Sequence, residues 1–114
     1  MAYDEYLADR VRMLLRERGI RAEEKRMMGG LCFMVRDKMC LGIVEERLMA
    51  RIGPEAYQPA LRQPGCREMD FTGRPMKGFV FVEEDGIDSD EALASWVQLC
   101  LDYNPRAKSS RRRK

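Results

Sequence analysis

Apolar residues recur with the period of an α-helix near both ends of the chain and with the period of a β-strand between them. Near the N-terminus this pattern predicts an amphipathic helix over residues 4–18, with Gly19 as its stop. Near the C-terminus it predicts a second helix, which Asp88 caps and Pro105 ends. The expected buried stripes are Leu7, Val11, Leu14 and Leu15 in the first helix and Leu93, Trp96, Val97, Cys100 and Leu101 in the second.

Between these helices, alternating apolar and polar residues predict a run of strands. A short helix from Gly53-Pro54-Glu55 to about Leu61 interrupts the run, with proline at its first position. A strand meander with so few interleaved helices favours an α+β fold. We therefore expect two layers, in which an antiparallel sheet of about five to six strands packs against the N- and C-terminal helices. The expected strands are 25–28, 31–36, 39–44, 47–52, 67–71 and 78–82.

The segment 31–44 is a predicted hairpin with two apolar faces. A two-residue loop at Asp37-Lys38 would place Arg36 opposite Met39 and Cys32 opposite Ile43. A hairpin with one solvated face alternates apolar and polar residues, so this hairpin should be covered on both sides. The domain's own helices can cover one side. We expect a second copy of the chain to cover the other, and we therefore predict a homodimer. The expected faces are Cys32, Met34, Leu41 and Ile43 on one side and Phe33, Val35, Cys40 and Val44 on the other.

The 114 residues suffice for one domain, which we expect to span 1–105. The remaining residues, 106–114, hold six of the 21 basic residues and no acid, and they predict a disordered basic tail. The folded part then carries 15 basic and 19 acidic residues, a net charge of −4. The tail is either a solvated end without specific function or a nucleic-acid contact. Its candidate contact residues are Arg111, Arg112, Arg113 and Lys114.

The sequence lacks the residues or motifs that several classes of function require. The chain has no histidine, which removes the usual general base near neutral pH and every Ser-His or Cys-His nucleophile. The four cysteines form no Cys-x-x-Cys pair, so we expect buried free thiols without a disulfide, with Cys66 the most exposed. The acidic run 83–91 lacks the spacing of a calcium loop, and we predict no metal and no cofactor. With neither a secretory leader nor an apolar run long enough to span a bilayer, the expected location is the cytoplasm.

Three sequence blocks, at 28–35, 51–57 and 70–82, carry a resemblance to a known family. They read Met-Gly-Gly-Leu-Cys-Phe-Met-Val, Arg-Ile-Gly-Pro-Glu-Ala-Tyr and Asp-Phe-Thr-Gly-Arg-Pro-Met-Lys-Gly-Phe-Val-Phe-Val. In order and spacing the chain resembles the N-terminal domain of the bacterial competence regulator TfoX, also called Sxy, over residues 5–103. The resemblance implies a two-layer fold with a secretion-chaperone-like outline and a role linked to competence gene regulation. The chain ends about where the C-terminal domain of the full-length regulators would begin, so we expect a stand-alone binding module.

The loop within 70–82 is the strongest candidate site. Arg74 and Lys77 lie on a turn shaped by Gly73 and Pro75, and such a turn can hold a phosphate or a carboxylate. Arg51 and Arg26 would join it from neighbouring strand ends. The structural alternative is that glycine and proline fix the turn while Arg74 pairs with a nearby acid.

Three functions remain open on these grounds. The first is a non-catalytic regulatory or adaptor domain that binds an unidentified protein partner, and we expect Met39 and Met49 at an interface because they alternate with charged neighbours. The second is a weak nucleic-acid binder that uses the tail and the Arg74/Lys77 loop. The third is a small-anion binder or an enzyme at that loop, with Asp70 as the base.

Overall fold

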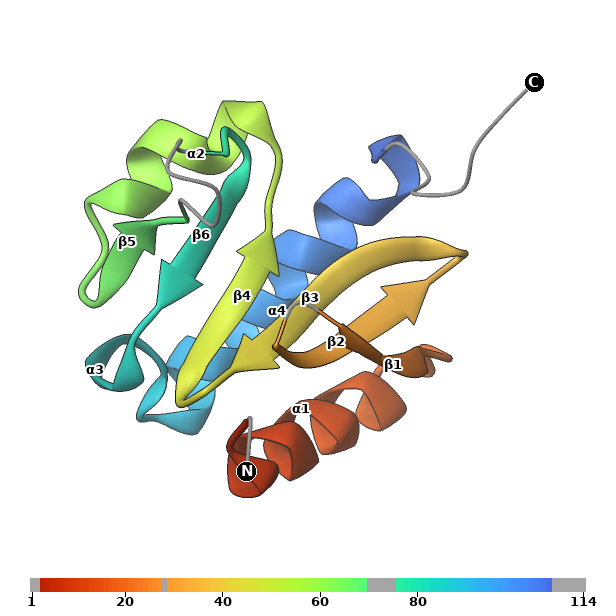
Figure 1. Ribbon diagram of the computed structural model, residues 1–114. Helices are drawn as coiled ribbons and strands as arrows, with labels where there is room; N and C mark the ends of the chain where they lie inside the picture. The colour runs from red at the N-terminus through yellow and green to blue at the C-terminus, as the bar shows by residue number, and fades with distance from the viewer. Residues whose placement is uncertain (1–2, 28, 70–75, 108–114) are drawn as a thin grey trace.

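The computed structural model describes residues 3–27, 29–69 and 76–107 (Figure 1). The helices are α1 (Glu5–Glu17), α2 (Pro54–Leu61), α3 (Glu84–Ile87) and α4 (Asp90–Tyr103), followed by the 3₁₀ turn η1 (Asn104–Arg106). The strands are β1 (Glu23–Met27), β2 (Gly30–Val35), β3 (Lys38–Val44), β4 (Arg47–Arg51), β5 (Cys66–Glu68) and β6 (Phe79–Val82).

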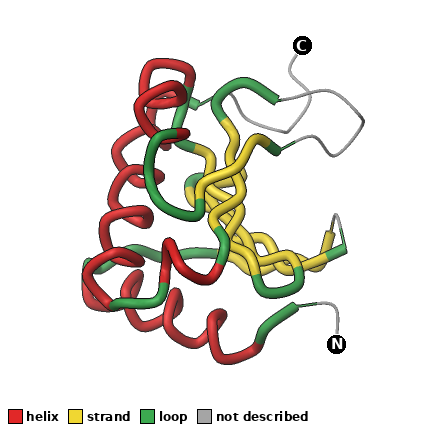
Figure 2. The backbone as a smooth tube through the Cα atoms, turned by 90° about the vertical axis from the view of Figure 1, so that its left-hand side faces the viewer, coloured by secondary structure: helices red, strands yellow, loops and turns green. Residues whose placement is uncertain are grey.

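The described strands form one antiparallel six-stranded sheet in the order β1-β2-β3-β4-β6-β5. Figure 2 shows the helices on one face of this twisted sheet, so the molecule has two layers. The fold is therefore α+β, as the sequence predicts. None of the helices in the described residues combines the length and the apolar character that crossing a membrane requires.

The two long helices form where the apolar stripes place them. Asp4 caps α1 by accepting hydrogen bonds from the backbone N–H groups of Tyr6 and Leu7. The cap of α4 is Ser89, whose hydroxyl accepts from the N–H of Ala92 at 3.0 Å, and the prediction of Asp88 is one residue too early. The buried residues of these helices are Leu7, Ala8, Val11 and Leu15, and Leu93, Trp96, Val97 and Cys100.

The turn of the β2–β3 hairpin lies one residue earlier than expected. Arg36 and Asp37 occupy it with φ angles of 54° and 65°, and Val35 pairs with Lys38. Positive φ at both central residues gives a two-residue turn the twist that flanking strands need. The predicted register, with Arg36 opposite Met39, is therefore wrong.

This shift, together with a bulge near Phe33, changes which side chains share a face. Phe33 pairs with Leu41. Leu41 and Ile43 belong to the core between the sheet and the helices, which we call the helix-side core. The prediction instead places them on one face with Cys32 and Met34. A slip of one residue moves a side chain to the other face of a sheet, which explains the error. The separation of Cys32 and Cys40 onto opposite faces is nevertheless confirmed.

The face of the sheet away from the helices has its own buried cluster, which we call the sulfur-rich face. Because these side chains are buried within a single chain, a second copy is not needed to cover the hairpin, and this argument for a homodimer fails. The buried members are Cys32, Met34, Val44, Met49, Met69 and Phe81, and the half-buried ones are Met39, Met76 and Phe79.

All four cysteines are buried and free, which confirms the prediction of no disulfide. Cys66, at 7%, is the most exposed of the four, as expected, although it is still buried. Burial raises the pKa of Cys32 and of Cys66 to about 11 and that of Cys40 to about 12. These thiols are therefore protonated near neutral pH. A cysteine nucleophile, by contrast, must be a thiolate.

Candidate functional site

The residues of the predicted anion site that the structure describes, Lys77, Arg51 and Arg26, do not all lie together. Gly73 and Arg74 lie outside the described residues, as does the candidate nucleic-acid contact 111–114. Lys77 is exposed two residues before the start of β6, and Arg51 ends β4. Arg26 lies on the edge strand β1.

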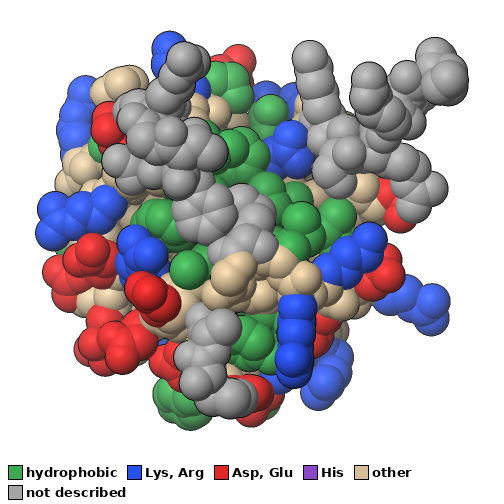
Figure 3. Space-filling view, viewed as in Figure 1, with side chains coloured by type: hydrophobic (Ala, Val, Ile, Leu, Met, Phe, Trp, Pro, Cys, Tyr) green, Lys and Arg blue, Asp and Glu red, His purple; other side chains and the backbone are tan. Residues whose placement is uncertain are grey.

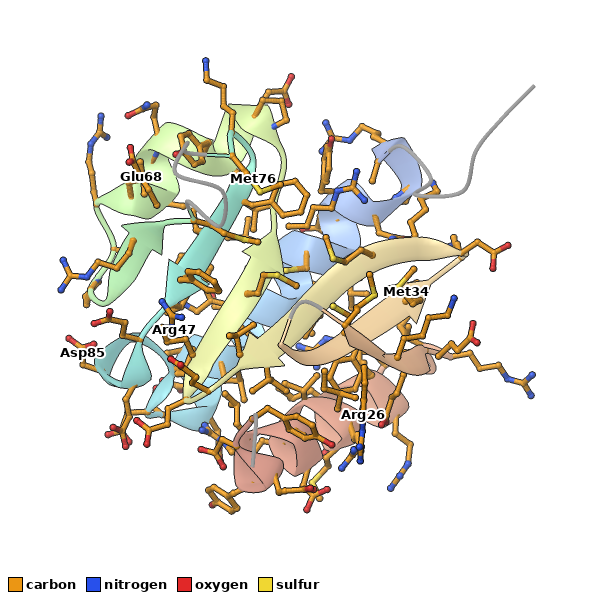
Figure 4. All side chains as sticks on the ribbon, viewed as in Figure 1. Arg26, Met34, Arg47, Glu68, Met76 and Asp85 are labelled. Atoms are coloured by element: carbon orange, nitrogen blue, oxygen red, sulfur yellow. The ribbon has the colours of Figure 1, made fainter. Side chains whose placement is uncertain are left out.

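Arg26 is separated from Arg51 in two ways. Three steps of about 4.8 Å lie between β1 and β4 in the sheet. Arg26 also pairs with Leu31 of the helix-side core, whereas Arg51 pairs with Phe79 of the sulfur-rich face. Directly opposite residues share a face, so the two guanidinium groups lie on opposite sides of the sheet. Figure 4 shows Arg26 beside α1, away from Met76 at the far end of β6.

Lys77 and Arg51 do lie at the same end of the sheet. The carbonyl of Gly78 accepts hydrogen bonds from the N–H groups of Ile52 and Gly53, at 2.8 and 3.1 Å. The chain entering β6 is thereby fixed against the segment that follows Arg51. Two of the predicted cations therefore lie at one end of the sheet, whereas Arg26 lies on a distant strand.

Two arginines from β4 lie across phenylalanine rings of the sulfur-rich face. Arg47 lies over Phe81, with its guanidinium carbon 4.0 Å from the ring centroid, and Arg51 lies over Phe79 at 5.3 Å. Arg51 also donates a hydrogen bond to the carbonyl of Met39 at 3.2 Å. Figure 3 shows apolar side chains gathered in the middle of this face. Cations over aromatic rings beside half-buried thioethers give a surface that can bind a protein segment.

A group of hydrogen bonds around Asn104, which the sequence did not reveal, anchors the end of α4 to the hairpin turn. The Asn104 amide, 1% exposed, donates to the carbonyl of Val35 at 3.1 Å and accepts from Arg36 at 2.9 Å. Lys38 donates to the carbonyls of Asn104 and Pro105 at 3.0 and 3.2 Å. The anchor fixes the point from which the basic tail departs. The only signal in the sequence was an asparagine between a helix and a proline.

The opposite end of the sheet is acidic. An open hollow of about 1050 Å³ is lined by Tyr3, Asp4, Glu45, Glu46, Arg47, Glu83, Glu84 and Asp85. In the described part of the chain, no group of three or more cysteines or carboxylates is arranged to hold a metal ion. The hollow therefore offers spread negative charge and no coordination site.

Comparison with known families decides the identity of the domain. The family model of the TfoX N-terminal domain matches residues 14–103. The chain belongs to the TfoX N-terminal domain family. No curated protein and no solved structure matches it. The matched range includes every strand of this TfoX N-terminal domain and therefore the whole sulfur-rich face. At the level of the family this is a competence-related regulatory domain.

Proposed function

We propose that this TfoX N-terminal domain is a non-catalytic regulatory or adaptor domain that acts in the cytoplasm through contacts with another protein, linked to competence or transcription regulation. The observation that carries the proposal is the family match over residues 14–103. The sulfur-rich face supports it, since Met39, Met76 and Phe79 are half-buried beside Arg47 and Arg51. Arginine, methionine and aromatic residues are enriched in protein interfaces. Met49 is 1% exposed, so our expectation that it lies at an interface is wrong for the chain as it stands.

A pull-down with matched variants tests the proposal. The bait is the intact protein, with Met76→Glu as the variant that places a charge on the sulfur-rich face and Ser95→Glu as the control on the exposed side of α4. A partner retained by the wild type and by Ser95→Glu but lost from Met76→Glu is the expected result. Equal retention by all three baits would place the contact elsewhere, and no retained protein above empty resin would count against the adaptor function.

A second candidate function is weak nucleic-acid binding through the tail. The observation that favours it is the concentration of six cations and no acid in residues 106–114. Arg106 and Ala107 still belong to the folded body, since Arg106 bonds to Glu55 at 3.2 Å and Ala107 is 6% exposed. A truncation that tests the tail alone therefore ends at Ala107. Small-anion binding at the Arg74/Lys77 loop stays a prediction.

We also retain the homodimer as a proposal, although the hairpin no longer argues for it. Light scattering over a range of micromolar concentrations tests it directly. A mass that rises towards twice the monomer mass is expected, and a monomer at every concentration would contradict it.

A further inference from the structure

We infer that the free edge of β1 pairs in antiparallel orientation with β1 of a second copy, about a two-fold axis through Lys25, to form one continuous sheet. The inference rests on the proposed homodimer and names its interface.

The edge is open for such pairing. β1 is the outermost strand and pairs only with β2, and its five residues are all exposed. Its register with β2 runs from Glu23 to Met27 without a bulge, and the strand contains no proline. A regular edge of this kind presents unpaired backbone N–H and C=O groups to another strand.

The symmetry restricts the register. Two antiparallel neighbours in one sheet are related by a two-fold axis perpendicular to it, so each residue faces one on its own side of the sheet. With the axis through Lys25, all five residues of β1 are paired. Glu24 then faces Arg26 of the second copy, twice, and Glu23 faces Met27.

The charges of β1 fit this register. Glu24 and Arg26 share the helix side of the sheet, because they pair with Phe33 and Leu31 of the helix-side core. Among the described residues, Glu23, Lys25 and Arg26 form no ion pair within the chain, so they are available to another copy.

Arg12 of α1 prepares Glu24 for this contact. It donates to both carboxylate oxygens at 2.7 and 2.9 Å, and the Glu24 side chain keeps 35% of its surface exposed. The hydrogen bonds from Arg12 lower the pKa of Glu24, so the carboxylate is ionised over the physiological range. Arg26 of a second copy would add a cation to an acid that is already oriented.

Charge on an edge strand usually keeps other strands away. This repulsion requires charges of a single sign. On each face of the sheet, however, β1 carries an acid and a base two residues apart. The one like-charge pair is Lys25 with itself on the axis, and Glu23 lies diagonal to it. We therefore expect a weak, reversible and salt-sensitive dimer.

An exposed apolar side chain also lies on this edge strand. Met27, the last residue of β1, is 38% exposed.

Engineered thiols test the axis. In Lys25→Cys the two new thiols face each other across the strands, close enough for a disulfide after a small adjustment. In the control Met27→Cys they lie about 14 Å apart along the strand. Mild oxidation followed by non-reducing electrophoresis should give a covalent dimer for Lys25→Cys, and monomer for the control and for the wild type with its four buried thiols. Equal linkage of Lys25→Cys and Met27→Cys would overturn the inference.

Charge reversal tests the Glu24–Arg26 pairs by light scattering. Arg26→Glu should raise the dimer Kd at least tenfold, and Arg67→Glu, the same change on β5 at the opposite edge, should leave it unchanged. If the wild type is a dimer but Lys25→Cys does not cross-link, the homodimer stands and this interface is wrong. If the wild type is monomeric throughout, both are wrong, while the pull-down still decides the adaptor function.

Discussion

At the scale of single residues, Asn104 is the buried polar side chain on which two parts of the fold depend. It is 1% exposed, and its amide connects the Val35 carbonyl to the Arg36 guanidinium. A buried carbonyl that loses its donor keeps the cost of leaving water without a replacement hydrogen bond. Asn104 therefore couples the end of α4 to the β2–β3 turn.

Asn104→Ala should lower the free energy of unfolding by about 1–3 kcal/mol, because it leaves the Val35 carbonyl unsatisfied and Arg36 without its acceptor. Chemical denaturation with urea measures the loss. Gln98→Ala is the control, since Gln98 bonds only at the exposed surface and should change stability by less than about 0.5 kcal/mol. Equal losses in the two variants would contradict the coupling.

The buried thiols predict a pH dependence of stability. Burial raises the pKa of Cys40 from 9.0 to about 12, so the unfolded chain releases this proton at lower pH than the folded chain does. Stability is then complete below about pH 9 and falls as pH rises towards 12, by up to about 1.4 kcal/mol per pH unit for this thiol. Denaturation at several pH values should show a shallower fall in Cys40→Ala than in the wild type. Parallel curves for the two proteins would refute this assignment.

At the scale of elements, the short helix α3 (Glu84–Ile87) is the part that the sequence did not predict. The sequence analysis places no helix between the strand 78–82 and the helix that Asp88 is expected to cap. The structure shows why a helix fits there: Gly86 lies against the Pro64 carbonyl, and its own carbonyl accepts from the Trp96 indole at 3.2 Å. These contacts are tertiary and leave no periodic pattern in a segment of four residues.

Gly86→Ala should destabilise the protein by about 2–4 kcal/mol, because an added Cβ would lie 2.3 Å from the Pro64 carbonyl oxygen and displace α3. Loss of the indole contact should also shift the fluorescence of Trp96, which is the single tryptophan. Ser95→Ala on the exposed side of α4 is the control and should leave both stability and emission unchanged. Wild-type stability and emission in Gly86→Ala would show that α3 does not depend on this close approach.

The elements with long apolar periods were predictable, and the details set by turns and loops were not. The two layers could be predicted from the apolar stripes of α1 and α4 and from the run of strands. Burial of many side chains on one face makes apolar residues recur at a regular spacing in the sequence. The hairpin register depended on whether Arg36 or Lys38 entered the turn, and both are ordinary polar residues. The candidate site failed at Arg26, since no local pattern states which strands become neighbours in the sheet.

At the scale of the whole molecule, charge is divided between two ends. The acidic hollow lies at the β3–β4 turn, whereas Lys77, Arg51 and the anchored start of the tail lie at the other end of the strands. With a net charge of −4, residues 1–105 offer a polyanion no long-range attraction.

The intact protein should bind duplex DNA weakly and without sequence preference, whereas residues 1–107 should not bind measurably. Fluorescence anisotropy at several salt concentrations gives the slope of log K against log salt. Each phosphate contact supplied by the tail should add about 0.9 to the magnitude of that slope. Arg74→Ala combined with Lys77→Ala should weaken binding by the intact protein further only if the turn adds a site. Tight, sequence-dependent binding by residues 1–107 would contradict the adaptor proposal.

The methionines of the sulfur-rich face can serve as spectroscopic probes of binding to that face. Met34, Met39, Met49, Met69 and Met76 all belong to this one face, on both sides of β4. With ¹³C at the methionine methyl groups, their NMR signals form a small set that monitors this side of the sheet, while Met13 on the outside of α1 supplies an internal reference. A partner that lands on the face would shift the Met39 and Met76 signals and leave Met13 in place. Dimerisation at β1 would instead move Met27, so a single spectrum distinguishes the two contacts.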